Sequence, residues 1–305
     1  MESTNPQYEF TGLKEDHLVS LKLLYRQVFK KKRSEDYFRK KYLSGFVIND
    51  SVASVAVYKN EVVAFVGAIP QIYQNGAHEK MIAHSCEYLT HTNHRKKGLH
   101  KKLIERTNEI LKSNGVNIVY AYFSDVSEGS VKSLGWDYQR YLHYGIVQTK
   151  GLPIQKTKYK LFGKSRWGSF KKGLKQADKI SIQSKFWMEP ITKDLLTYRS
   201  FTDNGIFEFS GCLFWIKLAE VLHVGKFSTT DYTLFKSGLE LLTARCRMFG
   251  IDKIVFQVDP KLEEYEFLIR YGLELKPGSH LGVHYLSEPE NVENFRFTYS
   301  SFDNF

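Results

Sequence analysis

The pattern of apolar and polar positions divides the 305-residue chain into helical and extended stretches. In the first 45 residues apolar side chains recur every three or four positions, which predicts helices over residues 15–29 and 35–42 after a short strand. An antiparallel meander of three strands is predicted next, because Asn75-Gly76 is a strong hairpin signal within a series of β-rich runs. These runs are residues 51–58, 62–73 and 81–91.

A strand, a basic loop and a helix follow one another directly after this hairpin. The run 81–91 leads into His94-Arg95-Lys96-Lys97-Gly98, and helical periodicity then continues from Leu99 to an Asn114-Gly115 terminator. Residues 116–123 are apolar without alternation, as is typical of a central strand. The first N–H groups of a helix lack partners within the helix, so this order predicts a phosphate site at the helix start.

The second half of the chain repeats this order of strands and helices. The corresponding segments are residues 212–224, 234–249, 253–258, 262–270 and 280–286. Ser228-Thr229-Thr230-Asp231 is a capping signature before the long helix, but no basic glycine loop is present, so this half is interpreted as a degenerate copy. The stretch after Glu290 is expected to be only partly ordered.

The predicted fold class is therefore α/β (α+β). It consists of two tandem domains, residues 1–149 and 186–305, each with a mixed, largely antiparallel sheet flanked by helices. A connector at residues 150–185 joins the two domains.

Charge is concentrated in this connector. The chain has a net charge of +11, and residues 150–185 contain eleven Lys or Arg against the single acid Asp178, a balance of +10. Such a balance favours an anionic partner: a phosphorylated cofactor, a nucleotide-linked substrate, nucleic acid or a membrane surface. A solvated connector with a basic helix is the alternative interpretation.

Cysteine usage and hydropathy argue against a disulfide-bonded, metal-binding or membrane-spanning protein. The three cysteines, Cys86, Cys212 and Cys246, have no metal-ligand spacing, so neither disulfides nor a metal site are expected. The longest apolar run, residues 62–70, is far shorter than the ~20 residues that span a bilayer. We therefore predict a cytoplasmic protein without membrane insertion.

The loop Arg95-Lys96-Lys97-Gly98-Leu99-His100 resembles the pyrophosphate-binding motif Gln/Arg-x-x-Gly-x-Gly/Ala of the GNAT superfamily of N-acyltransferases. His100 departs from the small residue of the motif. Leu134-Gly135-Trp136 stands where the family has its Leu-Gly-Phe/Trp turn, and the resemblance covers residues 8–149 in element order. It implies tandem GNAT-like domains, with acetyl-CoA as cosubstrate of the first.

The resemblance also implies which residues hold the cofactor. The pantetheine arm would pair with the main chain of Tyr88, Leu89 and Thr90. The pyrophosphate would be held by Arg95, Lys96, Lys97, Gly98, Leu99, His100 and Lys101.

Catalysis of this type needs a base for the attacking amine, and two residues are candidates. His84 occupies a position where some GNAT enzymes carry a histidine or glutamate base, and Glu87 is the second candidate. A structural histidine and a substrate-binding or salt-bridged acid are the alternatives. Strand parity predicts two faces in this run. His84, Cys86, Tyr88 and Thr90 would share one face, and Ser85, Glu87 and Leu89 the other.

The usual acid of the family, a tyrosine shortly before the glycine turn, is absent. Val131 occupies its position. The candidate substitutes are Tyr120, Tyr122, Ser127 and Ser130. Direct departure of the thiolate, with protonation by solvent, is the other possibility.

The segment Phe38-x-x-Lys41-Tyr42-Leu43, the strand residues Ile69-Pro70-Gln71 and the cofactor loop follow one another as in GNAT proteins of bacterial polysaccharide and amino-sugar biosynthesis, which most of the chain resembles. This implies a nucleotide-linked amino sugar as acceptor, bound by Lys41, Tyr42 and Gln71, with its diphosphate held by Lys171 and Lys172. Alternative acceptors are another small amine or a protein lysine. A catalytically silent module that binds nucleic acid or an anionic surface is the contrasting hypothesis, although no stable nucleic-acid partner is expected.

Overall fold

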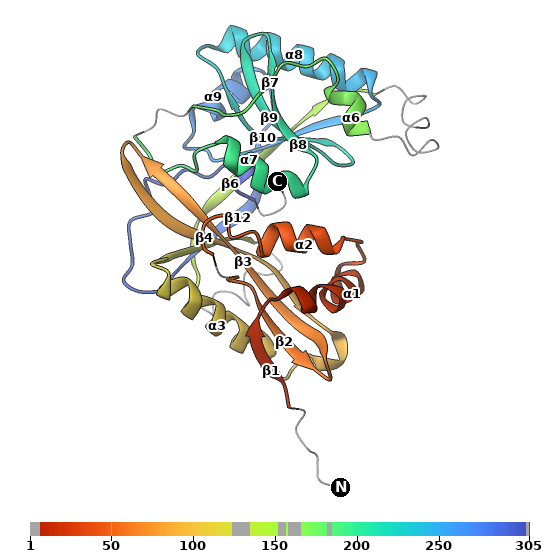
Figure 1. The fold of residues 1–305 in the computed structure, drawn as a ribbon. Helices are drawn as coiled ribbons and strands as arrows, with labels where there is room; N and C mark the ends of the chain where they lie inside the picture. The colour runs from red at the N-terminus through yellow and green to blue at the C-terminus, as the bar shows by residue number, and fades with distance from the viewer. Residues whose placement is uncertain are drawn as a thin grey trace. The chain divides into compact units, whose positions relative to one another are not determined.

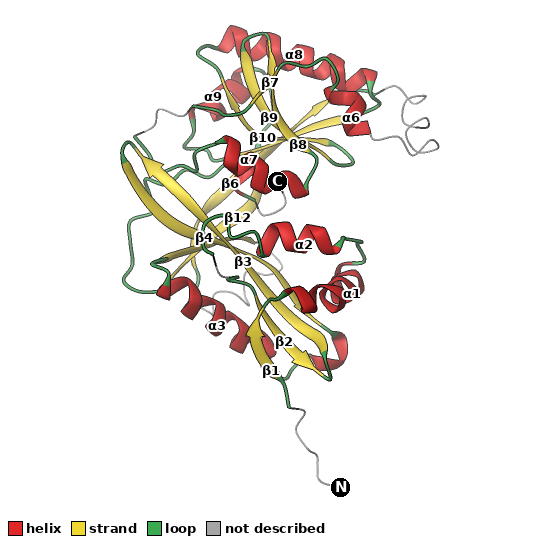
Figure 2. Cartoon of the chain, in the orientation of Figure 1, coloured by secondary structure: helices red, strands yellow, loops and turns green. Residues whose placement is uncertain are grey.

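The computed structural model describes residues 7–49, 51–123, 135–151, 157, 166–181, 185–302 and 305 (Figures 1 and 2). The chain forms two compact units. Unit 1 consists of Met1–Tyr73, Glu79–Ala121 and Val283–Asn291, and unit 2 of Gln74–His78, Tyr122–Gly282 and Val292–Phe305. Each is a mixed, largely antiparallel sheet flanked by helices. The division into domains at residues 149 and 185 stays a prediction.

Unit 1 is built around the strand order β1-β2-β3-β4-β5. The β1–β2 and β2–β3 pairs are antiparallel, whereas β4 and β5 run parallel and are joined through α3. The elements are β1 (Glu9–Gly12), η1 (Glu15–His17), α1 (Leu18–Phe29), α2 (Glu35–Tyr42), β2 (Ser54–Tyr58), β3 (Glu61–Asn75), β4 (His78–Thr90), η2 (Thr92–His94), α3 (Leu99–Ser113) and β5 (Ile118–Phe123).

Helices cover both faces of the unit 1 sheet (Figure 1). On β3, Phe65 packs against Tyr42 of α2, and the neighbouring Ala64 and Val66 join a cluster with Leu99 and Leu103 of α3. Ser34 is the N-cap of α2, because its Oγ accepts a hydrogen bond from Tyr37 N at 3.1 Å. Alternation along β3 therefore places α2 and α3 on opposite faces of the sheet.

Unit 2 contains the strand order β12-β6-β11-β10-β9-β8-β7. Here β10 and β11 are the parallel pair, joined through α8. The elements are β6 (Asp137–Gln148), α6 (Arg166–Lys171), β7 (Gln176–Ala177), α7 (Lys193–Tyr198), η4 (Arg199–Phe201), β8 (Asn204–Phe209), β9 (Cys212–Leu218), β10 (Leu222–Ser228), α8 (Tyr232–Met248), β11 (Lys253–Val258), α9 (Glu263–Arg270), β12 (Lys276–Tyr285) and η5 (Tyr299–Ser301).

The unit 2 structure differs from the sequence prediction at two places. Residues 212–224 were expected as one strand region but form β9 and the start of β10, which pair antiparallel with each other. The stretch after Glu290 was expected to be only partly ordered, yet Phe295 and Phe297 are fully buried and Arg199 Nη1 donates hydrogen bonds to Ser300 O and Phe302 O. The aromatic side chains of this segment bury apolar area and so order it. The prediction of partial order was based on its many polar residues.

Candidate active site

The basic loop turns sharply between β4 and α3. Lys96 and Gly98 have left-handed φ values of 59° and 73°. A Cβ on Gly98 would meet no atom within 4 Å, so glycine is favoured there by its backbone conformation and not by crowding. Gly98 is the N-cap of α3 and brings no side chain to cap the first turn. The N–H groups at this helix start are therefore not capped by the N-cap side chain and can bind an anion.

Positive charge surrounds this helix start. The Arg95, Lys96, Lys97 and Lys101 side chains are all exposed. Arg95 Nε donates to Thr90 O at 3.5 Å, and Lys97 Nζ lies 5.9 Å from the centre of the Tyr8 ring. Cations next to open backbone N–H groups are the donor set that a diphosphate requires.

His100, the departure from the family motif, packs sideways along α3. Its ring meets the Tyr88 ring edge-on with centroids 4.9 Å apart. Desolvation lowers the pKa of His100 and raises the pKa of Tyr88 to about 12, so both side chains are uncharged at neutral pH. A residue larger than glycine or alanine is accommodated here because its ring packs edge-on against Tyr88 of β4.

Strand β4 contains a bulge that the sequence did not reveal. Glu87 has a φ of 55°, although it lies inside β4. Cys86 and Glu87 both contact the Tyr42 hydroxyl, at 3.6 Å and 2.5 Å, whereas Ser85 Oγ and the Tyr88 hydroxyl are hydrogen-bonded to each other. The predicted strand parity is therefore wrong after Cys86, because a left-handed residue breaks the alternation of faces.

Glu87 belongs to a polar cluster with α2. Its Oε1 lies 3.1 Å from Lys41 Nζ and accepts a hydrogen bond from the Tyr37 hydroxyl, also at 3.1 Å, and its Oε2 accepts from Tyr42. The exposed fraction of the side chain is 0% for Lys41 and 9% for Glu87. The structure thus joins a predicted base, Glu87, to two predicted acceptor-binding residues. Sequence reasoning missed Tyr37, although its spacing of four from Lys41 places both on one helix face.

His84 and Gln71 meet through Tyr120. The His84 and Tyr120 rings stack with centroids 4.8 Å apart and an interplanar angle of 6°, at paired positions of the parallel strands β4 and β5. The Tyr120 hydroxyl donates to Gln71 Oε1, and both His84 and Gln71 are 3% exposed. The role of His84 as base stays a prediction.

The end of β4 reaches the loop through Tyr88, Leu89 and Thr90. Leu89 is buried, and the main chain beyond Thr90 is held where His91 N donates to Val63 O at 2.9 Å. These three residues connect the bulge to the basic loop, and their pairing with a pantetheine arm stays a prediction.

The remaining predicted residues belong to unit 2. Lys171 and Lys172 are exposed at the end of α6, and Arg245 Nη2 fixes this backbone by donating to Phe170 O and Lys172 O. Tyr122 stacks on Phe302 with ring centroids 3.7 Å apart. Ser127, Ser130 and Val131 lie outside the described residues. The structure therefore leaves the binding roles of Lys171 and Lys172 as predictions.

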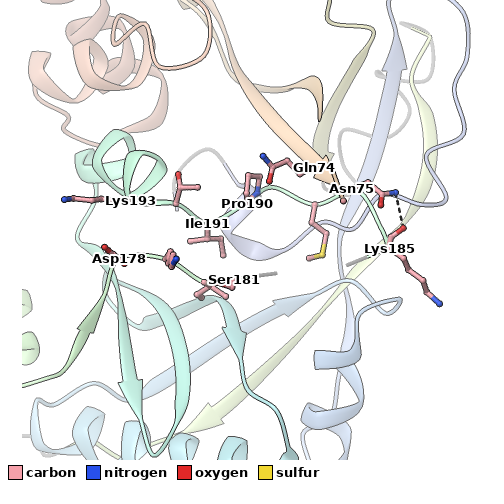
Figure 3. Close-up of a pocket in the computed structure, with 13 residues that line it drawn as sticks. Gln74, Asn75, Asp178, Ser181, Lys185, Pro190, Ile191 and Lys193 are labelled. Carbon is pink, nitrogen blue, oxygen red and sulfur yellow. Dashed lines mark hydrogen bonds between the residues drawn. The ribbon is translucent and has the colours of Figure 1, made fainter. Parts of the chain in front are cut away.

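A hollow of about 980 Å³ lies within unit 2 (Figure 3). Its wall includes Asn75, whose Nδ2 donates to Lys185 O at 3.1 Å. Lys185 and Lys193 line it, but Figure 3 shows both side chains directed outward, away from Ile191. The labelled lysines in this view therefore do not converge as a diphosphate would require.

The described part of the chain contains no group of three or more His, Cys, Asp or Glu that could hold a metal ion. Among the helices of the described residues, none is both long enough and apolar enough to cross a bilayer.

Comparison with known proteins agrees with this geometry. Residues 9–138 match the family model of the acetyltransferase (GNAT) domain. No curated protein sequence matches the chain. Three solved structures share the fold at low identity, and they were described as GCN5-related N-acetyltransferases from Kribbella flavida and Anabaena variabilis and a candidate acetyltransferase from Pyrococcus horikoshii.

The three structures are similar over nearly all of this chain. The Kribbella protein has a TM-score of 0.60 at 11% identity, with 93% of this chain and 72% of that chain covered. The Anabaena protein has a TM-score of 0.58 at 10% identity, with 92% of this chain and 73% of that chain covered. The Pyrococcus protein has a TM-score of 0.56 at 11% identity, with 98% of this chain and 96% of that chain covered. These likenesses show the fold, and the family model shows the domain. Residues 9–138 therefore form a GNAT acetyltransferase domain.

Proposed function

We propose that the protein transfers the acetyl group of acetyl-CoA to the amine of a nucleotide-linked amino sugar. GNAT enzymes use acetyl-CoA, and the observation that carries the proposal is the uncapped start of α3 beside four exposed cations. Main-chain N–H groups at this point and the side chains of Arg95, Lys96, Lys97 and Lys101 bind the pyrophosphate. The main chain of Tyr88, Leu89 and Thr90 binds the pantetheine arm.

The chemical step is direct transfer without an acyl-enzyme. The neutral amine nitrogen attacks the thioester carbonyl carbon, the C–S bond breaks, and CoA leaves as a thiolate that is then protonated. His84 accepts the amine proton, directly or through a water molecule. Its position supports this role, because the parallel pairing of β4 with β5 ends at His84 and Tyr120, three residues before the bulge at Glu87.

Glu87 is the second candidate for the base, and its contacts make it the weaker one. Its carboxylate already accepts from Tyr37, Lys41 and Tyr42, so most of its lone pairs are engaged within the protein. Lys41, Tyr42 and Gln71 contribute to the acceptor side of the site in this proposal, as polar groups on the elements next to His84.

The nucleotide-linked acceptor is proposed because of the charge of the connector. Residues 150–185 carry +10 of the net charge of +11, and a diphosphate is a chemical group that such a segment attracts. Lys171 and Lys172 are exposed on a backbone that Arg245 holds in place. A fixed main chain with exposed ammonium groups favours phosphate binding.

A substrate screen tests the proposal. Purified protein and acetyl-CoA are mixed with nucleotide-linked amino sugars, the same sugars without nucleotide, polyamines and lysine peptides, and release of free CoA thiol is followed. We expect turnover with a nucleotide-linked sugar and a far lower kcat/KM with the free sugar. Turnover confined to polyamines or peptides would show that the acceptor belongs to one of those classes and is not a nucleotide-linked amino sugar. Salt-sensitive oligonucleotide binding without any turnover would support the silent module instead.

Charge reversal tests the connector. We expect the pair Lys171→Glu and Lys172→Glu to raise the KM for the nucleotide-linked acceptor about tenfold while the KM for acetyl-CoA stays unchanged. Lys236→Glu, on the exposed side of α8, is the matched control for a change of net charge. An unchanged acceptor KM would show that these two lysines do not hold the diphosphate.

A further inference from the structure

Glu87 is held in a backbone conformation that its residue type disfavours. Its φ of 55° lies in the left-handed region, and it is the only non-glycine residue of this kind inside a strand of the described part of unit 1. Such a conformation costs free energy and persists only where surrounding contacts compensate for it.

Three donors from α2 hold the Glu87 carboxylate, and we call these four residues the Glu87 clamp. Lys41 Nζ and the Tyr37 hydroxyl each lie 3.1 Å from Oε1, and Tyr42 donates to Oε2 at 2.5 Å. Lys41 Nζ also donates to the Tyr37 hydroxyl at 3.1 Å. An ion pair at this degree of burial is expensive to break by removing one partner, so the clamp can fix the strand.

The donors are themselves held in place. Tyr42 packs edge-on against Phe65 of β3, with ring centroids 5.2 Å apart, and it lies directly over Gly67. A Cβ on Gly67 would come within 2.7 Å of the Tyr42 hydroxyl oxygen, so only glycine leaves room for this side chain. The clamp therefore connects β3, α2 and β4 around one carboxylate.

We propose that the Glu87 clamp is a positioning device, which acts through the β4 main chain and not as the catalytic base. The carboxylate fixes the left-handed bulge, and the bulge directs the main chain of the next three residues, Tyr88, Leu89 and Thr90, toward the acyl end of acetyl-CoA. This rests on the proposed pairing of those residues with pantetheine, but it does not depend on which acceptor the enzyme uses.

Equilibrium binding separates this proposal from a base. Acetyl-CoA and its fragment 3′-phosphoadenosine 5′-diphosphate are titrated calorimetrically into wild type and Glu87→Gln, with no acceptor present. We expect the Kd for acetyl-CoA to rise about tenfold in Glu87→Gln, since the pantetheine arm loses its aligned strand. The fragment contacts the basic loop alone, so its Kd should stay within about twofold. A general base would leave both Kd values unchanged.

A second substitution distinguishes positioning from general damage. Glu87→Gln leaves the buried Lys41 ammonium without the carboxylate 3.1 Å away, and Lys41→Met in the same chain removes that charge. Because the double variant still lacks the carboxylate that fixes the bulge, we expect its acetyl-CoA affinity to stay low, whereas recovery would show that the unpaired Lys41 charge alone caused the loss. Gly67→Ala displaces Tyr42 without altering a clamp residue and should also weaken acetyl-CoA more than the fragment.

The outcomes are decisive in both directions. Selective loss of acetyl-CoA affinity in Glu87→Gln and Gly67→Ala, without recovery in the double variant, supports the clamp. Unchanged acetyl-CoA binding in these variants overturns it, as does equal weakening of acetyl-CoA and the fragment. Because no amine is present, failure of the amino-sugar proposal would not affect these measurements.

Discussion

Two parallel strand–helix–strand connections in this chain have the same topology and opposite chemistry at the helix start. In unit 1, α3 begins at Gly98, which has a left-handed φ and no capping side chain. In unit 2, α8 begins at Asp231, whose Oδ1 accepts from Thr233 N at 2.5 Å and Leu234 N at 3.0 Å. One helix start is open to an anion, and the other is already occupied by a carboxylate of its own chain.

The comparison shows that the fold alone does not make a cofactor site. Parallel strands joined through a helix occur at both β4–β5 and β10–β11. Four exposed cations surround the start of α3, whereas Ser228-Thr229-Thr230-Asp231 before α8 contributes no cation and one acid. The capping residue and its neighbours therefore decide which connection can hold a diphosphate.

The histidines of the two parallel strands differ in the same way. His84 of β4 stacks on Tyr120 of the adjacent strand, inside the GNAT domain. His223 of β10 is hydrogen-bonded through Nδ1 to the Tyr299 hydroxyl at 2.9 Å. Burial, assisted by Lys217, lowers the pKa of His223 to about 4. We interpret the first as the catalytic candidate and the second as a structural residue.

The largest expected effect is on turnover, through His84. Because Gln cannot accept a proton from the amine, we expect His84→Gln to lower kcat by about 10²- to 10⁴-fold, while the Kd for acetyl-CoA changes less than about threefold. Steady-state thiol release and calorimetric titration measure the two quantities. A kcat within about threefold of wild type, under ~1 kcal/mol of barrier, would show that His84 is not the base.

The second expected effect is on stability, through His223. Its folded pKa of about 4 is below the ordinary value of 6.5, so between these pH values the unfolded chain binds a proton that the folded chain does not. Stability should therefore fall as the pH falls from 6.5 to 4, by up to about 3 kcal/mol from this group. In His223→Gln, which keeps an acceptor for Tyr299, this acid-dependent loss should shrink.

Urea unfolding at pH 7 and at pH 4.5 measures the His223 effect. The wild-type protein should lose more free energy of unfolding between the two pH values than His223→Gln does. Equal losses in the two proteins would mean that the acid sensitivity of the fold arises from other groups.

The third expected effect is on cofactor affinity, when α3 is given the chemistry of α8. Gly98→Asp places a carboxylate at the anion site, and we expect it to raise the Kd for acetyl-CoA about 100-fold, or about 2.7 kcal/mol. Gly98→Asn has a side chain of the same shape as Gly98→Asp, tolerates the left-handed conformation and adds no charge. Its Kd for acetyl-CoA should therefore rise roughly tenfold less than that of Gly98→Asp. Equal affinities of the two variants would contradict an electrostatic role for this helix start.

Much of the fold could be predicted from the sequence, because periodicity and local signals agree there. Ser34, Asn75-Gly76 and Asp231 are caps or turns whose side chains or φ values decide the local structure. The packing of the segment after Glu290 could not be predicted, since Phe295 and Phe297 are buried by residues far away in sequence. Local patterns carry no information about such distant partners.

The candidate site was predictable in its loop and not in its strand. Gly98 and its cations follow one another in sequence, so the motif already contains the anion site. The Glu87 bulge depends on Tyr37, Lys41 and Tyr42, about 50 residues away, and strand parity assumes that no such bulge exists. A left-handed glutamate has no sequence signal, because its cost is compensated by tertiary contacts.

The smallest expected effect is on stability, through Asp231, the N-cap of α8. Asp231→Ala removes the acceptor for Thr233 N and Leu234 N, and we expect it to lower the free energy of unfolding by about 1 kcal/mol. Opening this helix start should not create a second cofactor site, because no cation adjoins it in residues 228–231. Calorimetric titration should therefore find an unchanged number of acetyl-CoA sites, with Asp231→Asn as the control that keeps a capping oxygen. An additional acetyl-CoA site in Asp231→Ala would mean that the capping carboxylate alone closes unit 2 to the cofactor, and that the neighbouring cations of α3 are dispensable.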